Sequence, residues 1–352
     1  MRSIFKKRLL VCLITTAAAF DIGQAKTVSV AVPSYSMSLI AFMIAKDKGY
    51  YRQEDLDVNF VLMTAPLASR ALIGGNVEFA TVGGSALTGI LAGAPLRLLF
   101  SSFNRAVFWL YTKPEIRDVK ELRGKRLGVS AIGAGPDSML RDLLKTHGLD
   151  GGKDVAILAT GVDSNRYTAL TSGVVDGVLL STPYNFVAEE AGFRELVSFI
   201  KHDWVELQGC IVARDELLKG NPALVESFTA ATLKGLLYVR SNRSGTIPLI
   251  ERLMKVKPDL AAKIYDLTRP AMTSDGILTE ETQYKALEHL TKRMDLKEPP
   301  RRDKIYDFSV AEKARAQLSA RGWKPYLLTT EATLLLGRPV EDLTSSLPPA
   351  AF

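Results

Sequence analysis

The chain has 352 residues, and with 47% hydrophobic and 24% charged residues its composition is that of an ordinary globular protein, which excludes extensive disorder. A chain of this length predicts two folded lobes rather than a single core. Of the formal net charge of +7, residues 1–25 contribute +3, and the remaining +4 is too small to indicate nucleic-acid binding.

The N-terminus has the pattern of an export signal. Four basic residues precede an apolar run over residues 9–20, and small residues follow at Gly23-Gln24-Ala25. The run is too short for a membrane-spanning helix, so the pattern predicts a cleavable signal peptide over residues 1–25 and a periplasmic protein. Cys12 lies within this segment, and the bulky Val11 before it argues against a lipid anchor. Removal of the signal peptide leaves Cys210 as the one remaining cysteine, which excludes an intramolecular disulfide. Cys210 is therefore expected to be a small buried side chain.

The first part of the chain alternates strands and helices. Short β-branched or apolar runs end in small polar residues, and each is followed by a segment with helical spacing. The expected elements are strands at Thr27–Val32, Val58–Met63 and Phe79–Val82, and helices at Met37–Lys48, at Leu67–Ile73 and after Gly84.

A second unit repeats this design further along. Its expected strands are Arg126–Ser130, Val155–Ala159 and Gly177–Ser181, with helices from Pro136 and over Asn165–Ser172. Alternation of this kind predicts a parallel sheet, and the loops at the carboxyl ends of its strands form the usual ligand crevice. Two such units predict two lobes that face one ligand.

Beyond the second unit the chain is expected to be helical. Asn221-Pro222 has the pattern of a helix start, with an asparagine cap and proline at the first position, and Thr279 caps a further helix to Lys292. These helices are expected to pack on the first lobe, and residues 326–352 to form a loosely attached tail.

The order of several short segments carries a family resemblance. They are the helix ends Ala45-Lys46-Asp47-Lys48-Gly49-Tyr50-Tyr51 and Ala71-Leu72-Ile73-Gly74, Phe79-Ala80-Thr81-Val82-Gly83-Gly84, the stretch around Arg123-Gly124-Lys125-Arg126, Ala169-Leu170-Thr171-Ser172-Gly173, and Thr273-Ser274-Asp275-Gly276. Over about residues 28–307 the chain resembles the periplasmic substrate-binding proteins of the nitrate, sulfonate, taurine and thiamine-precursor group of ABC importers, and the related NMT1/THI5-like domain.

This resemblance implies an α/β fold of the type II periplasmic-binding-protein kind, a clamshell of two lobes. Each lobe would be a mixed sheet flanked by helices, with two hinge crossings between the lobes. Lobe 1 would contain residues 26–101 and 209–325, lobe 2 residues 102–203, and the return crossing residues 204–208. The expected partners are a small-molecule ligand and the permease and ATPase subunits of an importer, and the protein itself is expected to be a monomer.

The candidate ligand-binding residues follow the strands of both lobes. They are small or polar side chains and glycines that let the backbone approach a ligand, and Ser85 is expected to cap the helix after Gly84. Ordinary turn and capping roles remain an alternative at each position. The candidates are Ser34, Tyr35, Ser36, Thr64, Pro66, Gly83, Gly84 and Ser85 in lobe 1, Asn104 where the chain first crosses between the lobes, and Gly135, Asp137, Thr160, Gly161, Ser181, Thr182 and Tyr184 in lobe 2.

Charged side chains near these loops are few. Arg105 and Arg166 are the candidates to meet an anion, but the scarcity of arginines argues against a small, fully charged anion. A shortage of carboxylates in the same loops argues against a polyamine. The three histidines have no metal-ligand spacing, so neither a metal nor another cofactor is expected.

We therefore interpret the sequence as a non-catalytic, exported substrate-binding component of an ABC import system. Its ligand would be a sulfonate, a pyrimidine or an aromatic acid, held between two lobes. Two alternatives remain open at this stage. One is a periplasmic sensor that reports its ligand to a membrane receptor, and the other is an enzyme on the same fold related to thiamine-pyrimidine synthesis, although the cysteine-rich motif of those enzymes is absent.

Overall fold

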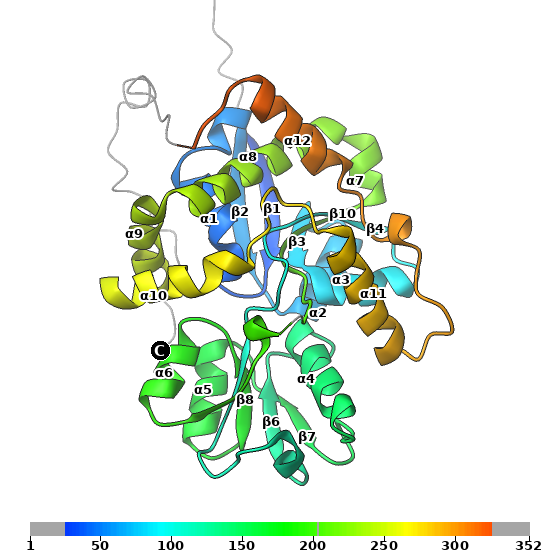
Figure 1. The fold of residues 1–352 in the computed structure, drawn as a ribbon. Coiled ribbons are helices and arrows are strands. Elements are labelled where there is room, and N and C mark those ends of the chain that lie inside the picture. Colours follow the sequence, from blue (N-terminus) through cyan, green and yellow to red (C-terminus); the bar gives the residue numbers. More distant parts are fainter. Residues whose placement is uncertain (1–24, 203, 326–352) are drawn as a thin grey trace, which may run out of the picture.

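A computed structural model describes residues 25–202 and 204–325 (Figure 1). Apart from Ala25, the expected signal peptide (residues 1–25) and the expected tail (residues 326–352) lie outside the described residues. Within the described part of the chain, none of the helices combines the length and hydropathy needed to cross a membrane.

Two five-stranded mixed sheets organise the chain, one in each lobe. In the first, β1 pairs in parallel with β2 and β3, while β10 is antiparallel to β3 and β4, which gives the order β2-β1-β3-β10-β4. Its β-branched and aromatic central strands bury both faces, and all four residues of β3 are buried. The strands are β1 (Lys26–Val32), β2 (Leu56–Leu62), β3 (Phe79–Val82), β4 (Leu96–Ser101) and β10 (Gln208–Arg214).

The second sheet repeats the same plan. Here β6 pairs in parallel with β7 and β8, and β5 is the antiparallel strand between β8 and β9, which gives the order β7-β6-β8-β5-β9. The strands are β5 (Trp109–Thr112), β6 (Arg126–Val129), β7 (Ala156–Ala159), β8 (Gly177–Leu180) and β9 (Arg194–Ser198). Thus each lobe receives one antiparallel strand directly after the chain has crossed into it.

The chain passes between the sheets twice, from β4 to β5 and from β9 to β10. The two crossings run side by side and are hydrogen-bonded to each other. Ala106 N donates to the carbonyl oxygen of Trp204 (3.0 Å), Val107 N to the side-chain oxygen of Gln208 (2.8 Å), and Ser102 N to the carbonyl oxygen of Gly209 (3.0 Å). Element-terminal segments of this kind are the usual hinges of domain closure.

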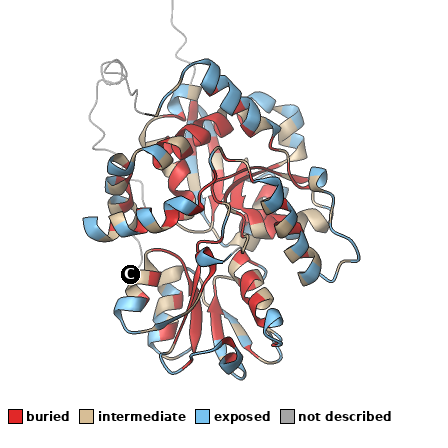
Figure 2. Cartoon of the chain, in the orientation of Figure 1, coloured by how far each residue is buried: buried red, intermediate tan, exposed pale blue. Residues whose placement is uncertain are grey.

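Helices cover both sheets, and Figure 1 shows α4 and the pair α5 and α6 on opposite sides of the lower sheet. Buried residues concentrate in the strands and on the inward faces of the helices (Figure 2). The α-helices are α1 (Ile40–Asp47), α2 (Ala65–Ile73), α3 (Gly83–Leu91), α4 (Gly135–Thr146), α5 (Asp163–Thr171), α6 (Tyr184–Glu190), α7 (Asp215–Gly220), α8 (Pro222–Ser241), α9 (Arg243–Met254), α10 (Pro258–Thr268), α11 (Glu280–Arg293) and α12 (Ser309–Ala320). Short 3₁₀ helices lie at Met37–Leu39, Arg52–Glu54, Val119–Leu122, Phe199–Lys201, Arg269–Ala271 and Arg302–Lys304.

The long helix α8 anchors the first lobe. As expected from the sequence, the Asn221 side chain caps it by accepting from Leu224 N (3.2 Å). Its Phe228 ring stacks on Phe79 of the central strand with ring centroids 4.2 Å apart. A Cβ atom on Gly235 would lie 2.0 Å from the carbonyl oxygen of Ala41, so only glycine allows α8 to lie this close to α1.

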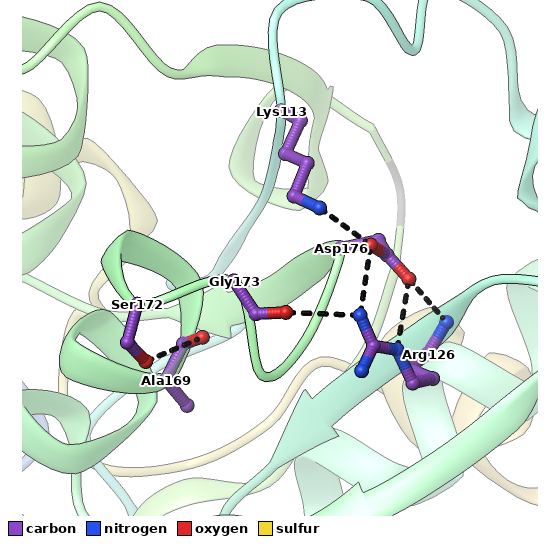
Figure 3. Close-up of polar contacts among 6 residues, drawn as sticks. All are labelled: Lys113, Arg126, Ala169, Ser172, Gly173 and Asp176. Atoms are coloured by element: carbon purple, nitrogen blue, oxygen red, sulfur yellow. Dashed lines mark hydrogen bonds and ion pairs between the residues drawn. The ribbon is translucent and has the colours of Figure 1, made fainter.

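A buried carboxylate joins the strands of the second sheet at the edge away from the crossings. Asp176 accepts from Lys113 Nζ (2.7 Å), from Arg126 N (2.9 Å) and from Arg126 Nε (3.3 Å), while Arg126 also donates to the carbonyl oxygen of Gly173 (Figure 3). Burial works to raise the pKa of the Asp176 carboxyl, but the hydrogen bonds from Lys113 and Arg126 hold this pKa well below its ordinary value.

Replacing Asp176 with asparagine is expected to lower the free energy of unfolding by about 2 kcal/mol at pH 7. This loss of stability is smaller than that for a fully buried ion pair, because the Arg126 side chain is half-exposed and water screens part of the attraction. Since the native carboxyl has the lower pKa, its contribution is present above about pH 4 and is lost as the pH falls. Urea unfolding at pH 7 and pH 3 measures this, with the exposed Asp57→Asn as control. An equal loss at both pH values would contradict the assignment.

Candidate functional site

A cavity of about 350 Å³ lies between the two lobes, with walls from both sheets and a floor from the two crossings. The loops that enclose it follow β1, β2 and β3 in one lobe and β6, β7 and β8 in the other, which are the carboxyl ends of the parallel strands. Nine of the sixteen residues proposed from the sequence line this cavity: Ser34, Ser36, Thr64, Gly83, Gly84, Ser85, Gly135, Gly161 and Ser181.

Hydroxyl groups dominate the wall formed by the loop after β1. The Ser34 hydroxyl donates to Ser36 Oγ (3.2 Å), and Ser36 Oγ lies 2.9 Å from Ser38 Oγ. Thr64 lies beside them at the start of α2, with its side chain exposed. This wall therefore offers groups that both donate and accept hydrogen bonds but carry no charge.

The expectation that Ser85 caps the helix after β3 is wrong. The helix α3 already begins at Gly83, so Ser85 lies in its first turn. Its hydroxyl lies 2.9 Å from Ser69 Oγ and bonds the carbonyl oxygen of Ala65 (3.3 Å), which ties α3 to α2. Gly83 is required by the chain itself, because a Cβ atom there would lie 2.4 Å from the Cβ of Leu207.

In the second lobe an ion pair closes the wall. Arg166 is 2% exposed and all three of its nitrogen groups are occupied: Nε donates to Leu179 O (2.5 Å), Nη1 to Gly161 O (2.6 Å), and Nη2 lies 2.5 Å from Asp163 Oδ1. Asp163 also accepts from Ser181 N (2.7 Å). Arg166 therefore holds the loops after β7 and β8 together, and its charge is paired with that of Asp163.

The floor comes from the crossings and includes a carboxyl group that the sequence interpretation missed. Phe108 and the run Glu206-Leu207-Gln208-Gly209 line the cavity, and Glu206 is 8% exposed. Burial raises the pKa of the Glu206 carboxyl to about 7, while the Arg293 guanidinium works to lower it and the Asp142 carboxylate to raise it. Since Asp163 also lines the cavity, the expected shortage of carboxylates at the site is wrong.

Three of the other proposed residues have structural roles within their own lobe. The Asp137 carboxylate accepts from Gly133 N (2.8 Å) and from Arg141 Nε (2.9 Å), so it is directed along α4 and not into the cavity. The Thr160 hydroxyl donates to Val129 O (3.3 Å) and extends the pairing of β6 with β7. Pro66 lies in the first turn of α2, just outside the lining.

The remaining four also lie outside the lining: Tyr35, Asn104, Thr182 and Tyr184. The Tyr184 ring packs on Tyr167 with centroids 5.9 Å apart, which places it in an aromatic cluster of lobe 2. Tyr35 packs on the edge of the main core, and Thr182 is buried. The backbone of Asn104 donates to Ala271 O (2.8 Å) at the outgoing crossing. Arg105, also considered for an anion, is exposed and outside the lining.

Several lining residues carry no sequence signal of their own. Leu62, Met63, Val82 and Phe108 are apolar side chains of the kind that any core strand contains. Glu206 had a usable signal, because an acidic residue between Val205 and Leu207 falls within the crossing that the sequence analysis placed at residues 204–208. A crossing between two lobes runs along the bottom of their cleft, so its charged residues are candidates for contact with a ligand.

Two lobes of the same topology, joined by two crossings around a cavity, define the type II periplasmic-binding-protein fold. The NMT1/THI5-like family pattern matches residues 36–244. The chain belongs to this family. No curated protein matches it significantly by sequence.

Solved structures support the fold. A protein from Bordetella bronchiseptica RB50 is similar with a TM-score of 0.74 at 18% identity, over 84% of this chain and 99% of that one. The alkanesulfonate-binding protein SsuA from Xanthomonas axonopodis pv. citri, bound to MOPS, gives 0.65 at 17% identity over 80% and 98%. The periplasmic nitrate-binding protein NrtA from Synechocystis PCC 6803 gives 0.66 at 12% identity over 86% and 92%.

Proposed function

We propose that this protein is the substrate-binding component of an ABC import system, exported to the periplasm, where it captures a small organic ligand between its lobes. The observation that carries the proposal is the cavity itself. It is built from strand-end loops of both lobes, so a ligand inside it contacts both and stabilises the closed arrangement. Its volume falls in the range of small-molecule sites.

The comparisons support a binding role. Similar structures include proteins named for binding alkanesulfonate and nitrate, and the family is that of the NMT1/THI5-like domain. We also propose that the protein delivers its ligand to a membrane permease and its ATPase, and that it is a monomer. The proposed division is residues 26–101 and 209–325 for lobe 1, residues 102–203 for lobe 2 and residues 204–208 for the return crossing. Contacts to the ligand are proposed for the nine lining residues found from the sequence, together with Glu206 and Gln208.

Thermal unfolding of the purified chain against a ligand panel tests the binding role. The panel contains sulfonates, pyrimidines, aromatic acids, organic amines and amidines, and inorganic anions. A compound present at 100 times its dissociation constant should add about 2.7 kcal/mol to the free energy of unfolding and raise the melting temperature visibly. Recovery of the compound unchanged would support a binding protein. A panel without any stabilising compound would count against the role, and a compound consumed during incubation would contradict the absence of catalysis.

A further inference from the structure

The Glu206 carboxyl on the floor has no side-chain hydrogen bond or ion pair within residues 25–202 and 204–325. It is 8% exposed and lines the cavity, and neither a hydrogen bond nor an ion pair to its oxygens is found among the described residues. A largely buried carboxylate that no side chain pairs with is costly, because it has lost much of its hydration. Such a group inside a ligand cavity points to a partner supplied by the ligand.

Two helices from opposite lobes begin beside this carboxyl group. A Cβ atom built on Gly84 of α3 would lie 2.6 Å from Glu206 Oε1, and one on Gly135 of α4 would lie 2.0 Å from the same oxygen. Neither helix has a hydrogen bond from a capping side chain. The carboxyl group is therefore held where the lobes meet, in space that only glycines leave open, and any ligand that reaches it contacts both lobes.

The charged groups that face Glu206 do not neutralise it. Arg293 of α11 is paired with Asp142 of α4 at 3.7 Å, so its charge is shared with another carboxylate. The thiol of Cys210 on β10 is neutral, since burial raises its pKa to about 12. The Asp142 carboxylate therefore offsets part of the effect of Arg293 on Glu206.

The cavity lining contains no free cation within residues 25–202 and 204–325. Its charged side chains there are Asp163, Arg166 and Glu206. Since the charges of Asp163 and Arg166 neutralise each other, an ionised Glu206 gives the cavity lining a net charge of one negative unit. Beside an ionised Glu206 a fully charged anion is disfavoured, whereas a cation with N–H donors would form a charge-assisted hydrogen bond to this carboxylate.

We propose that Glu206 selects the ligand, and that the ligand is an organic cation with an ammonium or amidinium group on a small apolar body. The nitrogen group donates to the Glu206 carboxylate between the starts of α3 and α4. The apolar body packs against Leu62, Met63 and Phe108, and the hydroxyl groups of the Ser34 loop meet any polar substituent. This inference rests on the proposed function, since it assigns a ligand class to the same cavity.

The test uses two probes that share a phenyl ring and differ in charge, benzamidine and benzenesulfonate, titrated calorimetrically into the full chain. Benzamidine is expected to bind at pH 8 and benzenesulfonate is not. Glu206→Gln keeps the size of the side chain and removes its charge, so it should weaken benzamidine binding at least tenfold. The exposed Glu190→Gln on α6 lies outside the cavity and should leave the affinity unchanged.

A pH series separates the proposed contact from a general packing effect. Binding needs the ionised carboxylate, and the pKa of free Glu206 is raised to about 7, so affinity for benzamidine should fall about tenfold between pH 8 and pH 6. The Glu206→Gln variant should show a flat profile.

Three results would overturn the inference: benzamidine does not bind, benzenesulfonate binds as tightly, or Glu206→Gln binds benzamidine as the wild type does. A stabilising sulfonate or aromatic acid in the wider panel would then preserve the proposed import function while Glu206 loses its role. No stabilising compound of any class would count against both.

Discussion

The Glu206→Gln variant is expected to be more stable than the wild type by about 3 kcal/mol at pH 8 and by less than about 1 kcal/mol at pH 5. Burial raises the pKa of the Glu206 carboxyl from 4.5 to about 7 in the folded protein. An acid whose pKa is higher in the folded state binds its proton more tightly there, so stability is lost as the pH rises from about 4.5 to 7. A shift of this size corresponds to about 3 kcal/mol above pH 7, and a neutral amide removes the loss.

Chemical unfolding of both proteins without ligand, from pH 5 to pH 8, measures the difference. Burial also raises the pKa of Asp142 to about 6, and burial lowers the pKa of His289. Both groups are present in the two proteins, so most of the effect of their own titrations cancels in the difference. A variant no more stable than the wild type at pH 8 would show that the buried carboxylate is satisfied by a group that the structure does not place beside it.

This effect and the proposed ligand preference have one physical origin. The unliganded protein keeps an acidic group in a largely buried position at a cost to its stability, and a cationic ligand recovers part of that cost when it binds. Residues that lower the stability of the folded state are common at functional sites, because the residue that binds a ligand best is often not the residue that stabilises the fold best. The same argument explains why Gly84 and Gly135 lie beside it: larger residues would displace the carboxyl group from the place where the lobes meet.

Most of the fold could be predicted from local patterns. The runs at Thr27–Val32 and Phe79–Val82 became β1 and β3 because β-branched and aromatic residues suit buried strands, and Asn221-Pro222 begins α8 as its capping pattern indicates. The start of α3 was missed because nothing in the residues alone distinguishes a Gly-Gly turn from a helix that begins with glycine. The contact with Leu207 decides between the two, and that contact spans more than one hundred residues.

The candidate site was predictable in position but not in chemistry. Strand-end loops line the cavity because topology brings the carboxyl ends of parallel strands together, which sequence alternation reveals. Which side chains face the cavity depends on tertiary packing. Asp137 accepts a hydrogen bond from Arg141, the Tyr184 ring packs on Tyr167, and Arg166 donates to backbone carbonyl groups. The sequence does not show which partner each of these side chains contacts, so too many polar loop residues were expected to line the cavity. Glu206, the acidic residue of the crossing, was not expected there.

The central claim is that this cavity is where the ligand binds, and filling it tests the claim most directly. Ser130, which lines the cavity after β6, is half-buried, so a tryptophan there has little freedom to turn away from it. Ile132 is 50% exposed in the same loop and outside the lining, which makes Ile132→Trp the matched control.

Isothermal titration of the tightest compound from the panel into the three proteins gives the answer. We expect one ligand per chain in the wild type, the same affinity in Ile132→Trp, and binding at least 100-fold weaker in Ser130→Trp, a loss of about 2.7 kcal/mol. Melting temperatures of both variants show whether they are folded. Wild-type affinity in a folded Ser130→Trp protein would contradict the account, because the ligand would then bind elsewhere.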